Sequence, residues 1–306
     1  TRPSGQRTRR LSQAVPRTMM EASDWTQLGQ SLVGERNGDH FGTALGLSAN
    51  GTIVAVGSSS YDSSNGPQSG CVRVFQLENV SNNPQWTPLG QTITGELGWE
   101  YFGQQIALSL DGAVLAAGAP SNKNTNGIRA GKVRVFFFDA GTNQWSQLGQ
   151  DILGVEAEAQ VPVSLSISDG GGTLAAADEN GNVYVYGYDD VSDQYVQKGQ
   201  TITGREGDDR FGKSLALSAN GSMLAVGAPG GMSATGYVQV LQFDTEKNVW
   251  APQGPSLEGE GAGDRFGWDV ALSSNGHFVA GGAIWNDGTA PNAGHVRVFG
   301  RSLTKT

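Results

Sequence analysis

Four carboxylates recur at one position of a repeated motif. An acid lies two residues before a Phe-Gly pair in four copies of this motif, at Asp39, Glu100, Asp209 and Asp264, and the third of the five copies has Ala159 instead. If the acids face one another around an axis, they form a ring at a channel mouth that could hold a cation or a basic peptide. If each carboxylate instead accepts hydrogen bonds from nearby backbone N–H groups, it stabilises the turn into the next strand, and a repeat reproduces such a turn in every copy.

No catalytic or metal-binding set repeats with the motif. A glycoside hydrolase needs two carboxylates roughly 5 to 10 Å apart. The fourth position of each copy, counted from the Phe, offers a single acid among Ala44, Gln105, Ser164, Ser214 and Asp269. The three histidines, His40, His277 and His295, fall at unrelated positions, so neither a metal triad nor a Ser-His-Asp set is indicated. The sequence therefore predicts no catalytic residue, no metal site and no cofactor.

The seven tryptophans fall into two groups. Four recur about ten or more residues before the Phe-Gly position, at Trp25, Trp86, Trp145 and Trp250, with Tyr195 in the third copy. They could stack on sugars, but a large aromatic side chain at one fixed place per repeat is typical of a core between repeats. Trp99, Trp268 and Trp285 have no equivalents, and they are candidates for a recognition surface.

The elements that must position these residues are short strands. In the copy FGKSLALSANGSMLAVGAP, which starts at Phe211, apolar residues alternate with small or polar ones and Asn220-Gly221 forms a tight turn. Each hairpin is followed by a Val-x-Val strand and then by the Trp segment. The five copies, which predict five sheets of four strands, start at Phe41, Phe102, Val161, Phe211 and Phe266. Such a repeat indicates an all-β, five-bladed β-propeller.

The two ends of the chain complement each other. The last Val-x-Val strand, at residues 296–299, has no Trp segment after it, whereas Trp25 opens a Trp segment that no blade precedes. We expect residues 25–33 to form the outer strand of the last blade and to close the ring. The predicted domain is residues 25–306, preceded by an arm of residues 1–24.

Charge separates the arm from the body. The arm has a net charge of +3. The whole chain has a net charge of −9, so the remaining residues have a net charge of −12. An acidic body argues against nucleic-acid binding. The arm is rich in Arg, Ser and Thr, which is typical of an organellar transit segment or of a secreted, processed protein, and the compartment stays open. No apolar run approaches the roughly 20 residues that span a bilayer. The sole cysteine, Cys71, is expected to point into a strand interior.

The Phe-Gly pair followed by Gly-Ala-Pro, in residues 114–120 and 224–229, and then by a G-x-V-x-V strand resembles the FG-GAP repeat of integrin α-chain propellers. The resemblance covers residues 25–300 and implies the propeller architecture. Calcium loops of that family are not expected here, because two-residue turns such as Asn50-Gly51 and Asp111-Gly112 cannot supply six to eight oxygen ligands.

These observations predict a non-catalytic interaction or scaffold module, not an enzyme, which serves as an accessory subunit of a larger assembly. The expected partner is another protein, bound by the arm and by the loops between the second and third strands. The candidate contacts are Arg7, Arg9, Arg10, Trp99, Pro162, Trp268 and Trp285. The alternatives are a carbohydrate-binding propeller and a glycoside hydrolase.

Overall fold

The computed structural model describes residues 26–80, 83–205, 209–230 and 234–301. Within these ranges the chain forms 23 strands and one three-residue 3-10 helix, Asp169–Gly171. No helix among the described residues is long and apolar enough to cross a membrane. The arm, with Arg7, Arg9 and Arg10, lies outside the described residues, as does Trp25.

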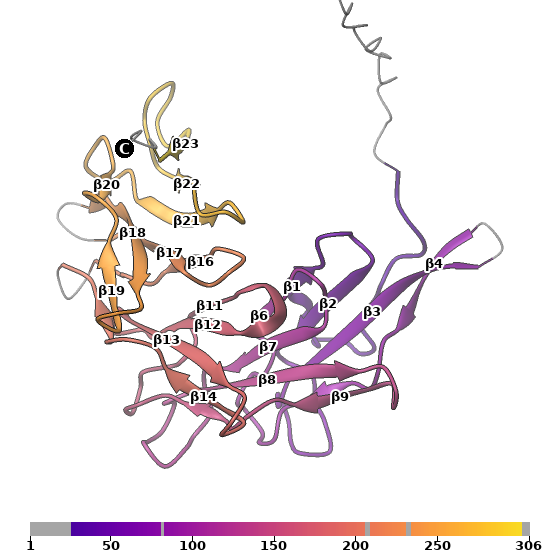
Figure 1. Cartoon of the computed structure of the whole chain (residues 1–306). Helices are drawn as coiled ribbons and strands as arrows, with labels where there is room; N and C mark the ends of the chain where they lie inside the picture. The colour runs from indigo at the N-terminus through magenta and orange to yellow at the C-terminus, as the bar shows by residue number, and fades with distance from the viewer. Residues whose placement is uncertain (1–25, 81–82, 206–208, 231–233, 302–306) are drawn as a thin grey trace, which may run out of the picture.

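The strands form five antiparallel sheets, the blades, in chain order (Figure 1). Blade 1 comprises β1 (Phe41–Leu47), β2 (Ile53–Ser58), β3 (Cys71–Val80), β4 (Asn83–Pro88) and β5 (Ile93–Thr94). Blade 2 comprises β6 (Gln105–Leu108), β7 (Val114–Ala119), β8 (Lys132–Asp139), β9 (Gln144–Gln147) and β10 (Ile152–Leu153). Blade 3 comprises β11 (Ser164–Ile167), β12 (Thr173–Ala177), β13 (Asn182–Asp189), β14 (Gln194–Gln197) and β15 (Ile202–Thr203). Blade 4 comprises β16 (Ser214–Leu217), β17 (Met223–Ala228), β18 (Tyr237–Asp244), β19 (Val249–Pro252) and β20 (Leu257–Glu258). Blade 5 comprises β21 (Phe266–Leu272), β22 (Phe278–Ala283) and β23 (His295–Gly300).

The molecule is a five-bladed β-propeller, which confirms the predicted fold. The hairpins form where the repeated motif predicts them. In blade 4, Leu215 pairs with Val226 and Leu217 with Leu224. The Asn220 side chain accepts hydrogen bonds from the Ser218 hydroxyl, 2.8 Å, and from the Ser222 backbone N–H, 3.1 Å, which fixes the turn.

The core lies between neighbouring blades. Trp145, Tyr195 and Trp250 are buried there, and the Trp145 indole N–H donates to the Leu89 carbonyl of the preceding blade at 2.8 Å. The packing interpretation is therefore confirmed for these three aromatic residues, whereas Trp86 is only half-buried and Trp25 lies outside the described residues. Cys71 is fully buried, as predicted, and burial raises the pKa of its thiol to about 11.

The two ends of the ring differ from the sequence-based expectation. The sheet of blade 5 has three strands in the described chain, and residues 26–33 form no strand. These residues contact blade 1 instead, because the Leu28 carbonyl accepts from the Trp86 indole N–H at 2.9 Å and the Gln30 side chain bonds the Trp86 backbone. The expected pairing of this segment with blade 5 is not made in this structure.

Candidate functional site in the channel

A polar cavity of about 360 Å³ lies where the inner strands of four blades meet. The fourth position of the motif in blades 2 to 5 contributes Gln105, Ser164, Ser214 and Asp269 to its wall, and the third position contributes Lys213 and Trp268. The fourth position taken alone has one acid, Asp269, and Lys213 lies at the neighbouring third position, so the sequence did not indicate that the two share a cavity. The structure brings a carboxylate, an ammonium group and an amide into one cavity.

The two serines of this wall serve the fold. The Ser164 hydroxyl donates to the Gly212 carbonyl at 2.6 Å, and the Ser214 hydroxyl donates to the Gly267 carbonyl at 3.1 Å. Each bond joins one blade to the next, and both serines are buried. The polar groups left to face a ligand are those of Gln105, Lys213 and Asp269.

Cations and indole rings alternate along one rim of the cavity. The Lys213 ammonium nitrogen lies 5.3 Å from the Trp268 ring centroid. The Arg265 guanidinium carbon lies 5.7 Å from the Trp268 centroid and 3.7 Å from that of Trp285. Of the non-repeating tryptophans predicted as recognition residues, Trp268 therefore lines the cavity, and Trp285 is joined to it through Arg265. Stacked indole and guanidinium planes suit a flat or ring-shaped ligand that carries negative charge.

The recurring acids do not face the channel as free carboxylates. Asp39, Glu100, Asp209 and Asp264 are all buried. Asp39 accepts from the backbone N–H of Arg36 at 2.8 Å, and Asp264 accepts from that of Gly261 at 2.9 Å. These bonds have the geometry expected of acids that stabilise turns. In blade 3, where Ala159 replaces the acid, buried Asp178 bonds Asn182 and Tyr184 instead.

The remaining predicted contact residues are dispersed. Trp99 is exposed on the loop before blade 2, where its backbone N–H donates to the Pro67 carbonyl at 2.8 Å. Pro162 is buried, and a Cβ added to Gly118 of blade 2 would meet its ring, so it does not lie on a surface open to a partner. Among the described residues, no group of three or more His, Cys, Asp or Glu side chains could hold a metal ion.

Comparisons with known proteins place the fold among known structures. No family model matches the chain, and no curated protein matches it. The resemblance to FG-GAP repeats therefore stays a prediction. A periplasmic gluconolactonase of Pseudomonas aeruginosa is similar in structure, with a TM-score of 0.52 and 16% identity over 82% of this chain and 66% of that one. A putative 6-phosphogluconolactonase of Bacteroides uniformis has a TM-score of 0.50 and 16% identity over 85% of this chain and 81% of that one. Hydrazine synthase of Kuenenia stuttgartiensis has a TM-score of 0.52 and 13% identity over 89% of this chain and 66% of that one.

These findings correct the predicted function. The sequence analysis expected a non-catalytic scaffold and no enzyme, whereas the similar structures bear the names of a gluconolactonase, a putative lactonase and a synthase. The physical reason for the error lies in the repeat. Positions that are identical in every blade are those that build the repeat, whereas Lys213 and Asp269 reach one cavity from different positions of different blades.

Proposed function

We propose that the protein is a hydrolase of small, polar cyclic esters, such as sugar lactones, and that the channel cavity is its active site. The observation that supports this proposal is the presence of Asp269, Lys213 and Gln105 in one cavity of about 360 Å³. The lactonase names of two similar structures supply the substrate class, and they carry no residue assignments to this chain.

The chemistry uses one carboxylate and one cation. Asp269 acts as general base: its carboxylate takes a proton from a water molecule as the water oxygen forms a bond to the lactone carbonyl carbon. Lys213 stabilises the negative charge that develops on the carbonyl oxygen. When the tetrahedral intermediate collapses, the ring C–O bond breaks, and the ring oxygen takes the proton back from Asp269. The products are the open hydroxy acid and a regenerated carboxylate.

The rim provides for binding. Trp268 lines the cavity, where its indole can contact the C–H groups of a sugar ring. Arg265, beside Trp268, attracts a carboxylate or phosphate where the substrate carries one. The Gln105 amide can donate to or accept from a ring hydroxyl.

The test is hydrolysis of gluconolactone by the purified chain, followed as acid release above the spontaneous rate. We expect Asp269→Asn to lower kcat/KM by about a hundredfold or more, in line with the effect of a lost general base. Glu246→Gln is the matched control, because Glu246 is an exposed acid in an outer turn of blade 4. The proposal is wrong if the wild-type chain does not exceed the spontaneous rate, or if Asp269→Asn is as active as the control.

A further inference from the structure

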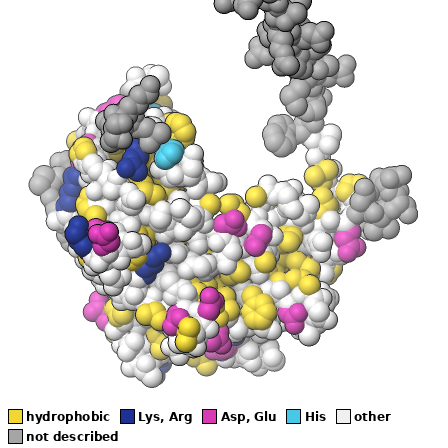
Figure 2. Space-filling model, viewed as in Figure 1, with side chains coloured by type: hydrophobic (Ala, Val, Ile, Leu, Met, Phe, Trp, Pro, Cys, Tyr) yellow, Lys and Arg dark blue, Asp and Glu magenta, His cyan; other side chains and the backbone are white. Residues whose placement is uncertain are grey.

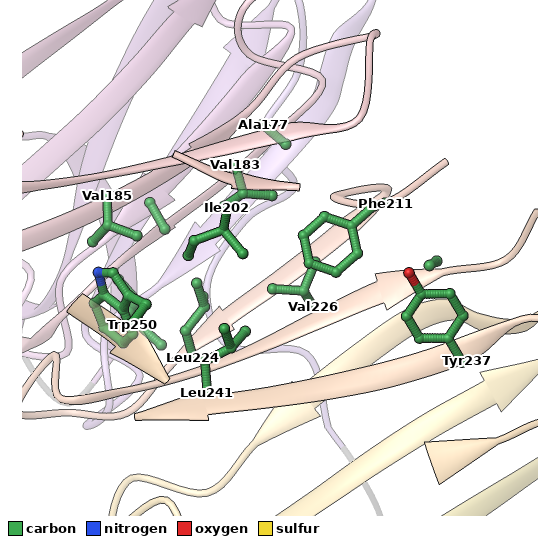
Figure 3. Close-up of a cluster of buried hydrophobic side chains, with 13 residues drawn as sticks. Ala177, Val183, Val185, Ile202, Phe211, Leu224, Val226, Tyr237, Leu241 and Trp250 are labelled. Atoms are coloured by element: carbon green, nitrogen blue, oxygen red, sulfur yellow. The ribbon is translucent and has the colours of Figure 1, made fainter. Parts of the chain in front are cut away.

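A second cavity, of about 340 Å³, lies between blades 4 and 5 and has a largely apolar wall. The apolar side chains that line it include Val240, Leu257, Leu272, Val279 and Phe299. These residues hold the repeat positions of Val185, Ile202, Leu217, Leu224 and Leu241, which form one buried hydrophobic cluster with Trp250 one blade earlier. Figure 3 shows Val185, Ile202, Leu224 and Leu241 in this cluster with Trp250. The cavity is therefore the place that a tryptophan fills in blade 4.

The backbone around the cavity repeats the same relationship. In blades 1, 2 and 4 the indole N–H of the repeated tryptophan donates to a backbone carbonyl of the preceding copy, at 2.8 to 2.9 Å. The accepting residue lies three positions after the aromatic residue of that copy. The pairs are Trp86 to Leu28, Trp145 to Leu89, and Trp250 to Lys198. The next residue is a glycine against which the indole packs, such as Gly199 under Trp250. Gly254 is the equivalent glycine, and it lies beside the cavity. A Cβ added to Gly254 would meet no described atom within 4 Å, whereas one added to Gly199 would lie 3.0 Å from the Trp250 indole.

Two sheet faces beyond this cavity are also exposed and apolar: the face of blade 5 that points away from blade 4, and the face of blade 1 that points away from blade 2. On blade 5, Val296 and Val298 are 69% and 67% exposed, whereas the equivalent valines of blade 2, Val133 and Val135, are fully buried. On blade 1, Leu45 is 68% exposed, whereas its equivalent in blade 2, Ile106, is 9% exposed. Hydrophobic side chains are visible at the surface on both sides of the opening between these blades (Figure 2).

The turns repeat the pattern. Met223 of blade 4 lies against the turn glycine of blade 5, Gly276, where an added Cβ would be 2.7 Å from its Cγ. Phe278 holds the position of Met223 in blade 5, and it is exposed. The turn glycine that it would cover is Gly51 of blade 1, near which an added Cβ would meet no described atom within 4 Å.

We infer that Trp25 fills this cavity and that residues 25–33 pair with β23, so that blade 5 packs against blade 1. The length of the segment supports this occupant. Trp25 precedes Leu28 by three residues, as Trp86 precedes Leu89, and Leu28 and Gln30 already bond Trp86 as the outer segment of a preceding blade does. Closure brings β1 beside β21, and the channel then has walls from all five blades.

Engineered disulfides test the inference. The backbone N–H of Ala219 donates to the Ser274 carbonyl at 2.9 Å across the interface of blades 4 and 5. Ala219→Cys with Ser274→Cys is therefore the control pair, because backbones this close suit a disulfide. Ala49 holds the same repeat position in blade 1, so Ala49→Cys with Ser274→Cys is the test pair. Both pairs are made in the full chain with Cys71→Ser.

We expect the test pair to form an intramolecular disulfide like the control pair, seen by intact mass under non-reducing conditions. Adding Trp25→Ala should reduce the test disulfide by about tenfold or more, since an unfilled cavity disfavours closure. The control pair should still form in the Trp25→Ala chain, which shows that blades 4 and 5 are folded, and Trp99→Ala should change neither pair.

Three results overturn the inference. The control pair forms while the test pair does not; the test pair forms only between two chains, which means that a second copy covers the exposed faces; or Trp25→Ala leaves the test disulfide unchanged.

Discussion

The interface between blades 4 and 5 and the edge between blades 5 and 1 use the same repeat positions with opposite results. At the first, Met223 and Val238 are buried. At the second, Phe278 and Val296 are exposed. The tryptophan sites lie one interface earlier: Trp250 fills the site between blades 3 and 4, and the site between blades 4 and 5 is a cavity. The comparison shows that no blade of this protein buries its own apolar faces. Each blade depends on its neighbour, so the stability of the last blade depends on what covers it.

The largest effect should come from the filled tryptophan site. Trp250→Ala removes a fully buried indole and its hydrogen bond to Lys198. It should lower the free energy of unfolding by about 3 to 5 kcal/mol. The midpoint of urea unfolding measures this change. Trp99→Ala, at an exposed site, should stay within about 0.5 kcal/mol of the wild type. Equal effects of the two variants would contradict the packing role of the repeated tryptophan.

The turn glycines give a matched pair across the comparison. Gly276 and Gly51 have nearly the same left-handed φ, +72° and +71°, but only Gly276 lies against a neighbour, Met223, in this structure. Backbone strain costs each Ala variant about 1 to 2 kcal/mol, and overpacking against Met223 adds about 1 to 3 kcal/mol to Gly276→Ala.

If blade 5 covers blade 1, Phe278 lies over Gly51, and Gly51→Ala should cost as much as Gly276→Ala in urea unfolding. If Gly51→Ala costs only the free energy of backbone strain, blade 5 does not cover blade 1 in solution.

A smaller effect should come from a buried acid. The Tyr237 hydroxyl donates to Asp209 Oδ2 at 2.6 Å in blade 4, whereas the equivalent position in blade 1, Cys71, has no hydroxyl. Tyr237→Phe should cost about 1 to 3 kcal/mol, because a buried carboxylate loses a donor. Thermal or urea unfolding of the variant measures this loss, and a change below about 0.5 kcal/mol would show that other donors satisfy Asp209.

The smallest effect concerns pH. Burial opposes ionisation of Glu96, but the hydrogen bond from Lys132 and the charge of Arg134 outweigh it, so the pKa of Glu96 is lowered. A lowered folded-state pKa stabilises the fold above the unfolded pKa, and this contribution is lost as the pH falls through the folded pKa.

Glu96→Gln should therefore cost less than about 1 kcal/mol at pH 7, because half of the side chain is exposed, and its difference from wild type should shrink in acid. A difference that grows as the pH falls would contradict this sign.

The sequence predicted what the repeat encodes. The Asn-Gly turns, the alternating strands and the repeated tryptophans predicted the propeller, because each is a local signal that recurs in most of the five copies. It could not predict the channel cavity, since Lys213 and Asp269 become neighbours only when the inner strands of different blades meet. It also missed Asp178, a buried acid at another position of blade 3 that accepts hydrogen bonds from Asn182 and Tyr184.

Hydrogen exchange of β23 tests the closure of the ring most directly. If residues 25–33 pair with β23, its outward-facing amides should exchange as slowly as those of β18, which pairs with an outer strand in this structure. Deleting residues 1–33 should then make β23 exchange fast and leave β18 protected. Fast exchange of β23 in the intact chain, with β18 protected, would contradict closure by this segment.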